Sequence, residues 1–415
     1  MQKPFTTTII GGGATGLFLA TLLSDTNGDV AIFERGPRVG RKLSATGNGQ
    51  GNISNLDVEN ARYFSLSKNG NALAHKIIND YNYESLKAHM ETLGVLLQAD
   101  ERGRVYPTGK QASAITDALR FATERKGVRV YLESQVTSLT KQGELFEITL
   151  KSENGEEKYY AKNAVLCTGG KSAKNFGTDG TAYALAQKFS HTLTPLYPSL
   201  VQLKTDVKKI KRLKGIRVSP ARVTATWTEK GATCSESVIG DILFTDYGVS
   251  GDAIFRLSAF FTDKIASGVK LFIDFLPDFT QEEIEKTLVK KRALLPELPF
   301  IELLGGIVNN QVGRTVMERV GKEDFRAIAN AVCRFELDVL GTLGFDYAQV
   351  TKGGICIDEV DENLQSKKVE NLYLAGEILD IDGQCGGFNL QWAYSSSACV
   401  ANAIAQKNRK DRGQV

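Results

Sequence analysis

The sequence has few of the residues on which metal and disulfide chemistry depend. Its 415 residues include three histidines and six cysteines, and the cysteines form neither a C-x-x-C pair nor the spacing of a zinc site. Three histidines are too few for a histidine-rich metal centre. We therefore expect no metal, free thiols in a reducing cytosol, and chemistry that depends on a bound organic cofactor.

The chain also lacks a strong charge imbalance and any long apolar run. Lysine and arginine outnumber aspartate and glutamate by 51 to 48, which gives a net charge of +3. So small an excess does not indicate a nucleic-acid-binding surface. No basic leader precedes an apolar segment, and no segment approaches about 18 unbroken apolar residues. We expect a cytoplasmic protein of two or three domains that binds neither nucleic acid nor membrane, with its oligomeric state left open.

The N-terminus carries a glycine-rich turn between a predicted strand and a predicted helix. The β-branched residues 6–10 precede GGGATG, the run LFLATLLS follows, and the next predicted strand, DVAIFE, ends at Glu34. In this G-x-G-x-x-G pattern the turn and the helix N-terminus favour a pyrophosphate, and the acidic residue can bind a ribose diol. The alternative is a glycine turn without a ligand. The residues predicted to bind the dinucleotide here are Gly11, Gly13, Ala14, Thr15, Gly16, Glu34 and Arg35.

Three later segments resemble those of FAD proteins of the glutathione-reductase-like superfamily. They are VRVYLESQVTSL with Val136, AVLCTGG with Thr168 and Gly169, and NLYLAGEILDIDG, where Gly376-Glu377 replaces the more usual Gly-Asp pair. No second G-x-G-x-x-G is present for a nicotinamide nucleotide. The resemblance implies FAD as the cofactor and a Rossmann-like α/β domain. Because its segments lie near both ends of the chain, we expect a discontinuous FAD domain of residues 1–190 and 345–415.

Five motifs resemble, more closely, a family of bacterial three-domain flavoproteins that includes aminoacetone oxidase and flavoproteins tied to bile-acid dehydroxylation. Three of them are GRKLSATGNGQGNISN, GRVYPTGKQASAITDAL and ILFTDYGVSGDAIFRLS. The other two are longer and start with GGKSAKNFGTDGTAYALAQ and VTKGGICIDEVDENLQ. Many relatives have G-R-C-N where this chain has GQGN at residues 49–52, so a mechanism that needs that cysteine is excluded. The resemblance implies a β-rich substrate domain of residues 191–275 plus about 335–345, interrupted by a helical domain of residues 276–334.

Two segments are expected to lie against the cofactor. In the first, GRKLSATGNGQGNISN, positive side chains can neutralise the pyrophosphate, and glycines and asparagines can approach a flat ring. The alternative is a surface loop with incidental charge. In the second, DGQCGGFNLQW, the N-terminus of a helix can face the flavin carbonyl edge. Cys385 is interpreted there as a small neighbour of the ring. The predicted contacts are Arg41, Lys42, Gly47, Asn48, Gly49, Asn52, Gly387, Asn389, Leu390 and Gln391.

The reaction has three candidate forms. The preferred one is oxidation of a small primary amine, such as aminoacetone, by FAD, with O2 taking the electrons to give H2O2. The second is reduction of an activated carbon–carbon double bond with electrons from NAD(P)H, and the third is a non-catalytic redox sensor. Lys352 is the candidate charge that stabilises reduced flavin, against the alternative of a solvated lysine in a turn. Tyr197 and Tyr247 are candidate substrate-pocket residues, and His191 is interpreted as structural.

Overall fold

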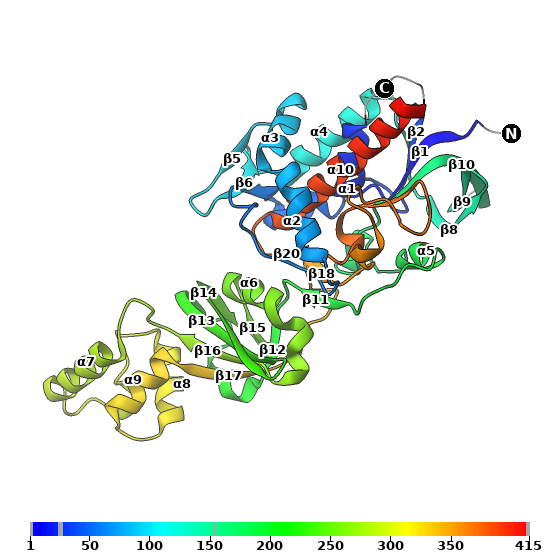
Figure 1. The fold of residues 1–415 in the computed structure, drawn as a ribbon. Helices are drawn as coiled ribbons and strands as arrows, with labels where there is room; N and C mark the ends of the chain where they lie inside the picture. Colours follow the sequence, from blue (N-terminus) through cyan, green and yellow to red (C-terminus); the bar gives the residue numbers. More distant parts are fainter. Residues whose placement is uncertain (1–2, 24–27, 153–154, 412–415) are drawn as a thin grey trace. The chain divides into compact units, whose positions relative to one another are not determined.

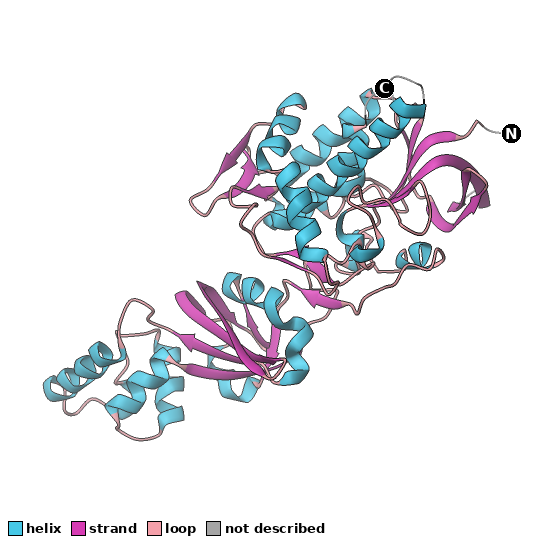
Figure 2. Cartoon of the chain, in the orientation of Figure 1, coloured by secondary structure: helices cyan, strands magenta, loops and turns pink. Residues whose placement is uncertain are grey.

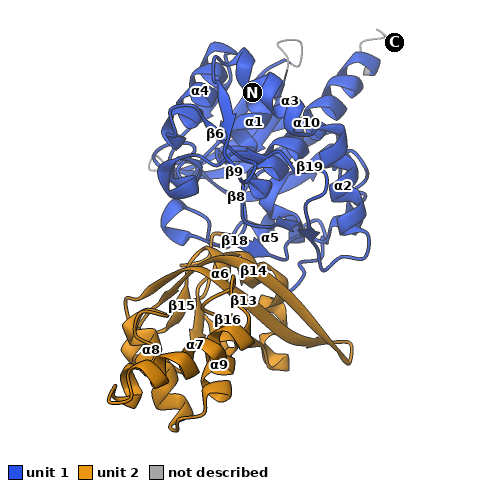
Figure 3. Cartoon of the chain, turned by 90° about the vertical axis from the view of Figure 1, so that its left-hand side faces the viewer, with its two compact units in different colours: residues 1–197, 350–415 blue, residues 198–349 orange. Residues whose placement is uncertain are grey.

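The computed structural model describes residues 3–23, 28–152 and 155–411, and the chain divides into two compact units (Figure 3). Unit 1 comprises Met1–Tyr197 and Val350–Val415, and unit 2 comprises Pro198–Gln349. The sequence placed these boundaries near residues 190 and 345. No helix among the described residues has both the length and the apolar character needed to cross a membrane.

A seven-stranded mixed sheet forms the centre of unit 1. Its strand order is β7-β2-β1-β10-β9-β8, with β19 paired to β10. The strands β7, β2, β1, β10 and β19 are parallel to one another, whereas β9 pairs antiparallel with β10 and β8 pairs antiparallel with β9. The strands are β1 (Phe5–Ile10), β2 (Val30–Phe33), β7 (Arg129–Tyr131), β8 (Gln135–Gln142), β9 (Leu145–Ser152), β10 (Gly155–Leu166) and β19 (Leu372–Leu374).

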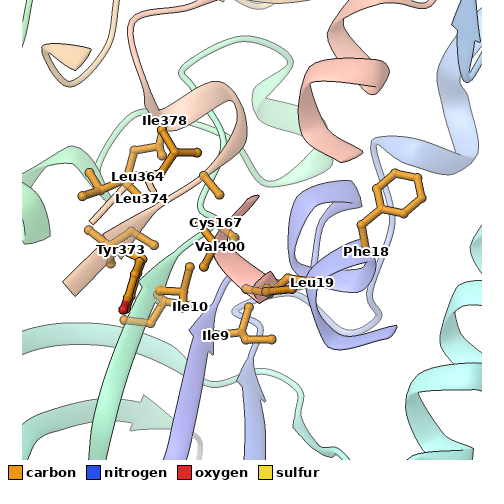
Figure 4. Close-up of a cluster of buried hydrophobic side chains, with 14 of the residues drawn as sticks. Ile9, Ile10, Phe18, Leu19, Cys167, Leu364, Tyr373, Leu374, Ile378 and Val400 are labelled. Atoms are coloured by element: carbon orange, nitrogen blue, oxygen red, sulfur yellow. The ribbon is translucent and has the colours of Figure 1, made fainter. Parts of the chain in front are cut away.

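The parallel strands form because their side chains are apolar or β-branched on both faces. All four residues of β2 are buried, as are all three of β19, the pattern of strands covered on both sides. Helix α1 (Ala14–Leu22) packs against α10 (Phe388–Asp411) and α4 (Ala112–Arg125), which brings the two ends of the chain side by side (Figure 1). Ile9, Leu19, Leu374 and Val400 meet in this core (Figure 4). The predicted Rossmann-like fold is confirmed.

Smaller elements of unit 1 lie around this core. The strands β3 and β5 flank β6 in a three-stranded sheet, and β4 pairs with β20. The chain passes between the units at β11 and just before β18. These elements are β3 (Ser54–Asn55), β4 (Tyr63–Phe64), α2 (Gly70–Asp80), α3 (Tyr83–Thr92), β5 (Leu97–Ala99), β6 (Arg104–Pro107), α5 (Tyr183–Gln187), β11 (Tyr197–Ser199), β18 (Val350–Lys352) and β20 (Asp382–Gly383).

Unit 2 is built on a closed six-stranded barrel with the order β12-β15-β14-β13-β16-β17 (Figure 2). Buried residues of the barrel and of its helices form one apolar cluster. The predicted division of this region into a β-rich and a helical domain therefore stays a prediction. The elements are β12 (Leu203–Thr205), β13 (Arg217–Glu229), β14 (Ala232–Phe244), β15 (Gly248–Ser250), α6 (Asp252–Phe261), β16 (Lys270–Asp274), α7 (Gln281–Leu294), α8 (Asn310–Val320), α9 (Phe325–Cys333) and β17 (Phe335–Thr342).

Candidate functional site

The glycine-rich turn lies at the carboxyl end of β1 and leads directly into α1. Gly11 has a φ of +105°, and a Cβ there would stand 2.5 Å from the Cys167 carbonyl oxygen. A Cβ on Gly16 would stand 2.0 Å from the Gly11 carbonyl oxygen. Around Gly13, by contrast, an added Cβ would meet no heavy atom within 4 Å. The outer glycines thus allow close packing, while the middle one leaves room beside the N-terminus of α1, where Ala14 and Thr15 begin the helix.

Glu34 follows β2 and is held in one orientation by two backbone amides. Its Oε2 accepts a hydrogen bond from the Gly12 N–H at 2.8 Å, and its Oε1 accepts one from the Gly36 N–H at 2.7 Å. Each carboxylate oxygen retains further accepting capacity. A fixed carboxylate beside the turn suits the two hydroxyl groups of a ribose.

The chain after β7 carries the segment that is predicted to contact the adenine. The Glu34 N–H donates to the Tyr131 carbonyl and the Ser134 N–H donates to the Glu34 carbonyl, both at 2.9 Å. Val136 is the second residue of β8, which begins at residue 135. The predicted backbone contact at Val136 stays a prediction.

Three predicted cationic residues already have partners within the protein. Lys42 Nζ lies 2.9 Å from Glu377 Oε2, and the other oxygen of Glu377 accepts from the Thr351 N–H at 2.9 Å. Arg41 donates to the Asn175 carbonyl at 2.7 Å, and Arg35 pairs with Asp179. Because Arg41 bonds to a neutral carbonyl, this contact leaves its positive charge in place, and its predicted contact with the diphosphate stays a prediction.

The carboxyl ends of β10 and β19 lie at the same edge of the sheet as the glycine-rich turn. The Gly376 N–H donates to Ser396 Oγ at 3.0 Å, and Trp392 Nε1 donates to the Gly376 carbonyl at 3.1 Å, so α10 fixes this peptide. Thr168 Oγ1, beside Gly169, is buried and has no hydrogen-bond partner among the described residues. A buried orphaned hydroxyl, an open turn at Gly13 and an oriented carboxylate fit a dinucleotide that supplies hydroxyl and phosphate groups.

The predicted ring-contacting loop, residues 43–52, is only partly available for a ligand. Gly47 and Asn48 have left-handed backbones, with φ of 58° and 54°, and Asn48 and Gly49 are exposed. The predicted cofactor contact of Asn52 stays a prediction, and its side-chain N–H2 donates to the carbonyls of Ser54 at 3.0 Å and Val105 at 3.1 Å. Asn52 therefore braces β3 and β6, and its amide nitrogen is not free to bind a ring.

The backbone before α10 is shaped by contacts within the protein. Gly387 has a φ of +99°, and a Cβ there would stand 2.1 Å from the Ser54 carbonyl oxygen. Asn55 Nδ2 donates to the Gly386 carbonyl at 3.1 Å. Close approach to β3, rather than to a ring, is thus a sufficient reason for glycine at 387. Cys385 in the same loop is partly exposed, and none of the six cysteines, all of which lie in the described part of the chain, forms a disulfide.

The first turn of α10 offers fewer free amides than the sequence predicts. The Gln391 N–H donates to the Gly387 carbonyl at 3.0 Å, so it is already used. The amides of Asn389 and Leu390 belong to the first turn and have no acceptor within the helix. The Asn389 side chain accepts from the Gly383 N–H at 2.8 Å and donates to the Gly383 carbonyl at 2.9 Å. It therefore fixes the loop that precedes the helix.

Lys352 is a buried residue at the end of β18. Only 4% of its surface is exposed, and its Nζ lies 4.9 Å from the centroid of the Phe64 ring. Phe64 pairs with Asp382 in the β4–β20 ladder, next to the loop that leads to α10. The alternative of a solvated lysine in a turn is wrong, because Lys352 is itself buried and is the last residue of a strand that is buried throughout.

The remaining candidates lie elsewhere. Tyr197 belongs to unit 1 and Tyr247 to unit 2, each half-buried, and their shared role in a substrate pocket stays a prediction. His191 is buried, with Nδ1 3.1 Å from Glu359 and Nε2 2.8 Å from Ser366 Oγ. Burial lowers the pKa of His191, against the opposing effect of Glu359. The structural interpretation of His191 is confirmed.

Sequence reasoning missed three polar residues that organise the site. Thr351 Oγ1 accepts from the backbone N–H groups of Lys171 at 2.8 Å and Ser172 at 3.0 Å. Asp380 is buried and accepts from the Ser67 N–H at 2.8 Å; burial raises its pKa, and its hydrogen bonds oppose that rise. Asp179, the third, pairs with Arg35. The partners named in this paragraph lie 144 to 313 residues away, so no local pattern could have revealed these contacts.

Comparisons with known proteins agree with this architecture. Residues 5–403 match the family model described as "HI0933-like protein Rossmann domain". The chain is 30% identical to a 3-dehydro-bile acid delta(4,6)-reductase of Clostridium scindens, over 96% of this chain and 98% of that protein. It is 28% identical to a ribosomal RNA dihydrouridine synthase of Haemophilus influenzae, over 96% and 98%.

A solved flavocytochrome c3 fumarate reductase shares the fold. It aligns with a TM-score of 0.50 and 14% identity, over 98% of this chain and 79% of that one. The family match bears out FAD, the cofactor expected from the sequence, whereas the substrate stays a prediction. The chain belongs to the HI0933-like Rossmann family and is an FAD-dependent oxidoreductase.

Proposed function

We propose that the protein is an FAD-dependent reductase of a carbon–carbon double bond conjugated to a carbonyl group. The names of the two relatives above carry this proposal, because both denote that reaction. A 3-dehydro bile acid with double bonds at positions 4 and 6 is an unsaturated ketone, and dihydrouridine forms when the uracil double bond beside a carbonyl is reduced. Both relatives align with nearly the whole of this chain.

In this proposal some residues of the chain bind the cofactor and others stabilise charge during the reaction. FAD, when bound and reduced, supplies a hydride for such a double bond. Glu34 orients the adenosine ribose, and the first turn of α1 binds the diphosphate. Arg41 adds an uncompensated positive charge, whereas Lys42 is largely neutralised by Glu377.

Lys352 is the residue proposed to stabilise negative charge during the reaction. Hydride addition to an unsaturated carbonyl compound builds negative charge on its oxygen, and reduced flavin is itself anionic near neutral pH. A buried ammonium group stabilises such charge more strongly than a solvated one, because little water screens it. The burial of Lys352 and its contact with the Phe64 ring support this role.

The amine oxidase preferred from the sequence is the second candidate. Its support is the five motifs shared with the flavoprotein family that includes aminoacetone oxidase. In this alternative O2 is the electron acceptor and H2O2 the product. The expected absence of a nucleic-acid partner also stays a prediction, since one relative is named for ribosomal RNA.

Anaerobic flavin bleaching separates the candidates. The holoprotein is mixed with NADH or NADPH in one experiment and with aminoacetone in another, and the absorbance of oxidised flavin is followed. Bleaching by a nicotinamide nucleotide supports the reductase, bleaching by aminoacetone supports the oxidase, and bleaching by neither supports the sensor. The reduced protein is then mixed with a 3-oxo-4,6-diene bile acid or with uridine-containing ribosomal RNA. If neither substrate reoxidises the flavin faster than buffer, the reductase proposal fails for both.

A further inference from the structure

Two loops that follow different strands are joined across the phosphate-binding turn. In the sheet, β1 lies between β2 and β10, and all three strands are parallel at this point. The loop after β2 and the loop after β10 therefore leave the same edge of the sheet on either side of the Gly11–Gly13 turn. A contact between these loops passes over the carboxyl end of β1.

Two arginines of the first loop make that contact. Arg35 Nη1 lies 3.1 Å from each carboxylate oxygen of Asp179, and Arg41 Nη2 lies 2.7 Å from the Asn175 carbonyl oxygen. Asp179 is oriented by Thr181, whose N–H and Oγ1 donate to Oδ1 at 3.0 and 2.7 Å. Side-chain exposures of 28% and 26% place the Arg35–Asp179 pair partly out of water.

The second loop is also held at its other end. Thr351 Oγ1 accepts from the Lys171 and Ser172 amides, and Thr178 Oγ1 donates to the Ser172 carbonyl. Residues 172–181 are therefore anchored to β18 on one side and to the arginines on the other. Such a segment opens only when one set of anchors breaks, and the Arg35–Asp179 pair is the more exposed set.

We propose that Asp179 is a positioning residue of the FAD site, which holds Arg35 across the turn so that the Arg35–Asp179 bridge slows the release of FAD. A dinucleotide seated at Gly11–Gly13 has to pass the two joined loops when it leaves. The proposal rests on FAD as the cofactor and not on the direction of the reaction. It therefore survives even if the reductase proposal fails.

A purely electrostatic role for these residues predicts a different result. Asp179 places a negative charge near the diphosphate, so its removal would slow FAD release, whereas removal of the Arg35 charge would accelerate it. If the two side chains act as a bridge, Asp179→Asn and Arg35→Gln both accelerate release. The signs of the two changes therefore decide between the alternatives.

The test is the rate of FAD release from the holoprotein after dilution, followed by the rise in flavin fluorescence. We expect each single variant to release FAD roughly fivefold faster, the scale of a partly exposed ion pair. The double variant should be no faster than either single one, because the same contact is lost once. Unchanged or slower release from Asp179→Asn would overturn the proposal.

Control variants guard against a general loss of stability. Glu124→Gln breaks an exposed pair with Arg120 within α4, 2.8 Å long, and should leave the release rate unchanged. If Asp179→Asn does not fold, Arg35→Lys tests the same bridge, because lysine keeps the charge but has a shorter side chain that ends before the position of Nη1, the atom that contacts both oxygens of Asp179. Release from Arg35→Lys must then also accelerate, and an unchanged rate overturns the proposal.

Discussion

Gly387 offers the sharpest test of how the loop before α10 is built. Its replacement by alanine adds a single methyl group. In the observed backbone that Cβ would stand 2.1 Å from the Ser54 carbonyl oxygen and 2.5 Å from the Ser54 carbonyl carbon. Both atoms belong to the backbone of β3, so no side-chain rotation can relieve the contact. The loop or β3 must move.

The substitution Gly387→Ala lowers the free energy of unfolding in two ways. A non-glycine residue in a left-handed conformation, here with φ of +99°, costs about 1–2 kcal/mol. Forcing an extra carbon into a packed site costs about 1–3 kcal/mol more. Gly94 provides the matched control, because its φ is +75° and an added Cβ would meet no heavy atom within 4 Å. Gly94→Ala should therefore cost about 1 kcal/mol, from backbone strain alone.

The assay is urea unfolding of both variants and the wild type, with the FAD content of each purified protein. We expect Gly387→Ala to lower the free energy of unfolding by about 2 kcal/mol more than Gly94→Ala, because only the Gly387 substitution forces a carbon atom into a packed site. It should also lose FAD, because the displaced loop leads into the first turn of α10. Equal unfolding midpoints and equal FAD content for the two variants would refute this account of the loop.

Three further predictions test single side chains. Burial, and secondarily the charge of Lys126, lowers the pKa of His89 to about 4. Because the pKa in the unfolded chain is higher, about 6.5, the folded protein is destabilised by about 3 kcal/mol as the pH falls from 6.5 through 4, and the full stability is present above pH 6.5. In urea unfolding at several pH values, His89→Gln should make this loss of stability at low pH smaller. Lys352→Met should slow the step in which electrons leave the flavin by about tenfold or more in stopped-flow absorbance, and an unchanged rate would remove its electrostatic role. Glu34→Gln should weaken FAD binding about tenfold in a flavin-fluorescence titration, because the glutamine side chain lacks the carboxylate charge that accepts from the Gly12 N–H. An unaltered affinity would contradict the assignment of Glu34 to the ribose.

The parts of the fold that could be predicted from the sequence are those encoded by neighbouring residues. The run at residues 6–10, the glycine turn and the helix after it appear as β1, the turn and α1, because periodicity and glycine spacing are local signals. The strands β10 and β19 follow in the same way. The helix at the end of the chain was also expected, although it begins at Phe388 and its Gln391 amide is already bonded.

The contacts that long-range folding creates could not be predicted. The partner of Arg35 lies 144 residues along the chain, and Thr351 binds amides 179 and 180 residues away. Asn52 has a side-chain amide that can bind a ligand, yet its N–H2 group donates to the Val105 carbonyl, which β6 places beside it. A polar residue in a loop shows that it needs a partner, but only the assembled fold shows which one.

Lys352 shows why the cofactor can be established while the direction of the reaction stays a proposal. The residues proposed to border the adenosine and diphosphate, such as Glu34 and the glycine turn, would act in the same way whether the flavin gains or loses electrons. The buried cation Lys352 would also serve both directions, since in an amine oxidase and in a double-bond reductase alike it would stabilise the negative charge of a reduced cofactor. The discriminating property is therefore the source of the electrons. For that reason the reaction with NADH, NADPH or aminoacetone in the absence of oxygen tests the function more directly than any substitution in the FAD site.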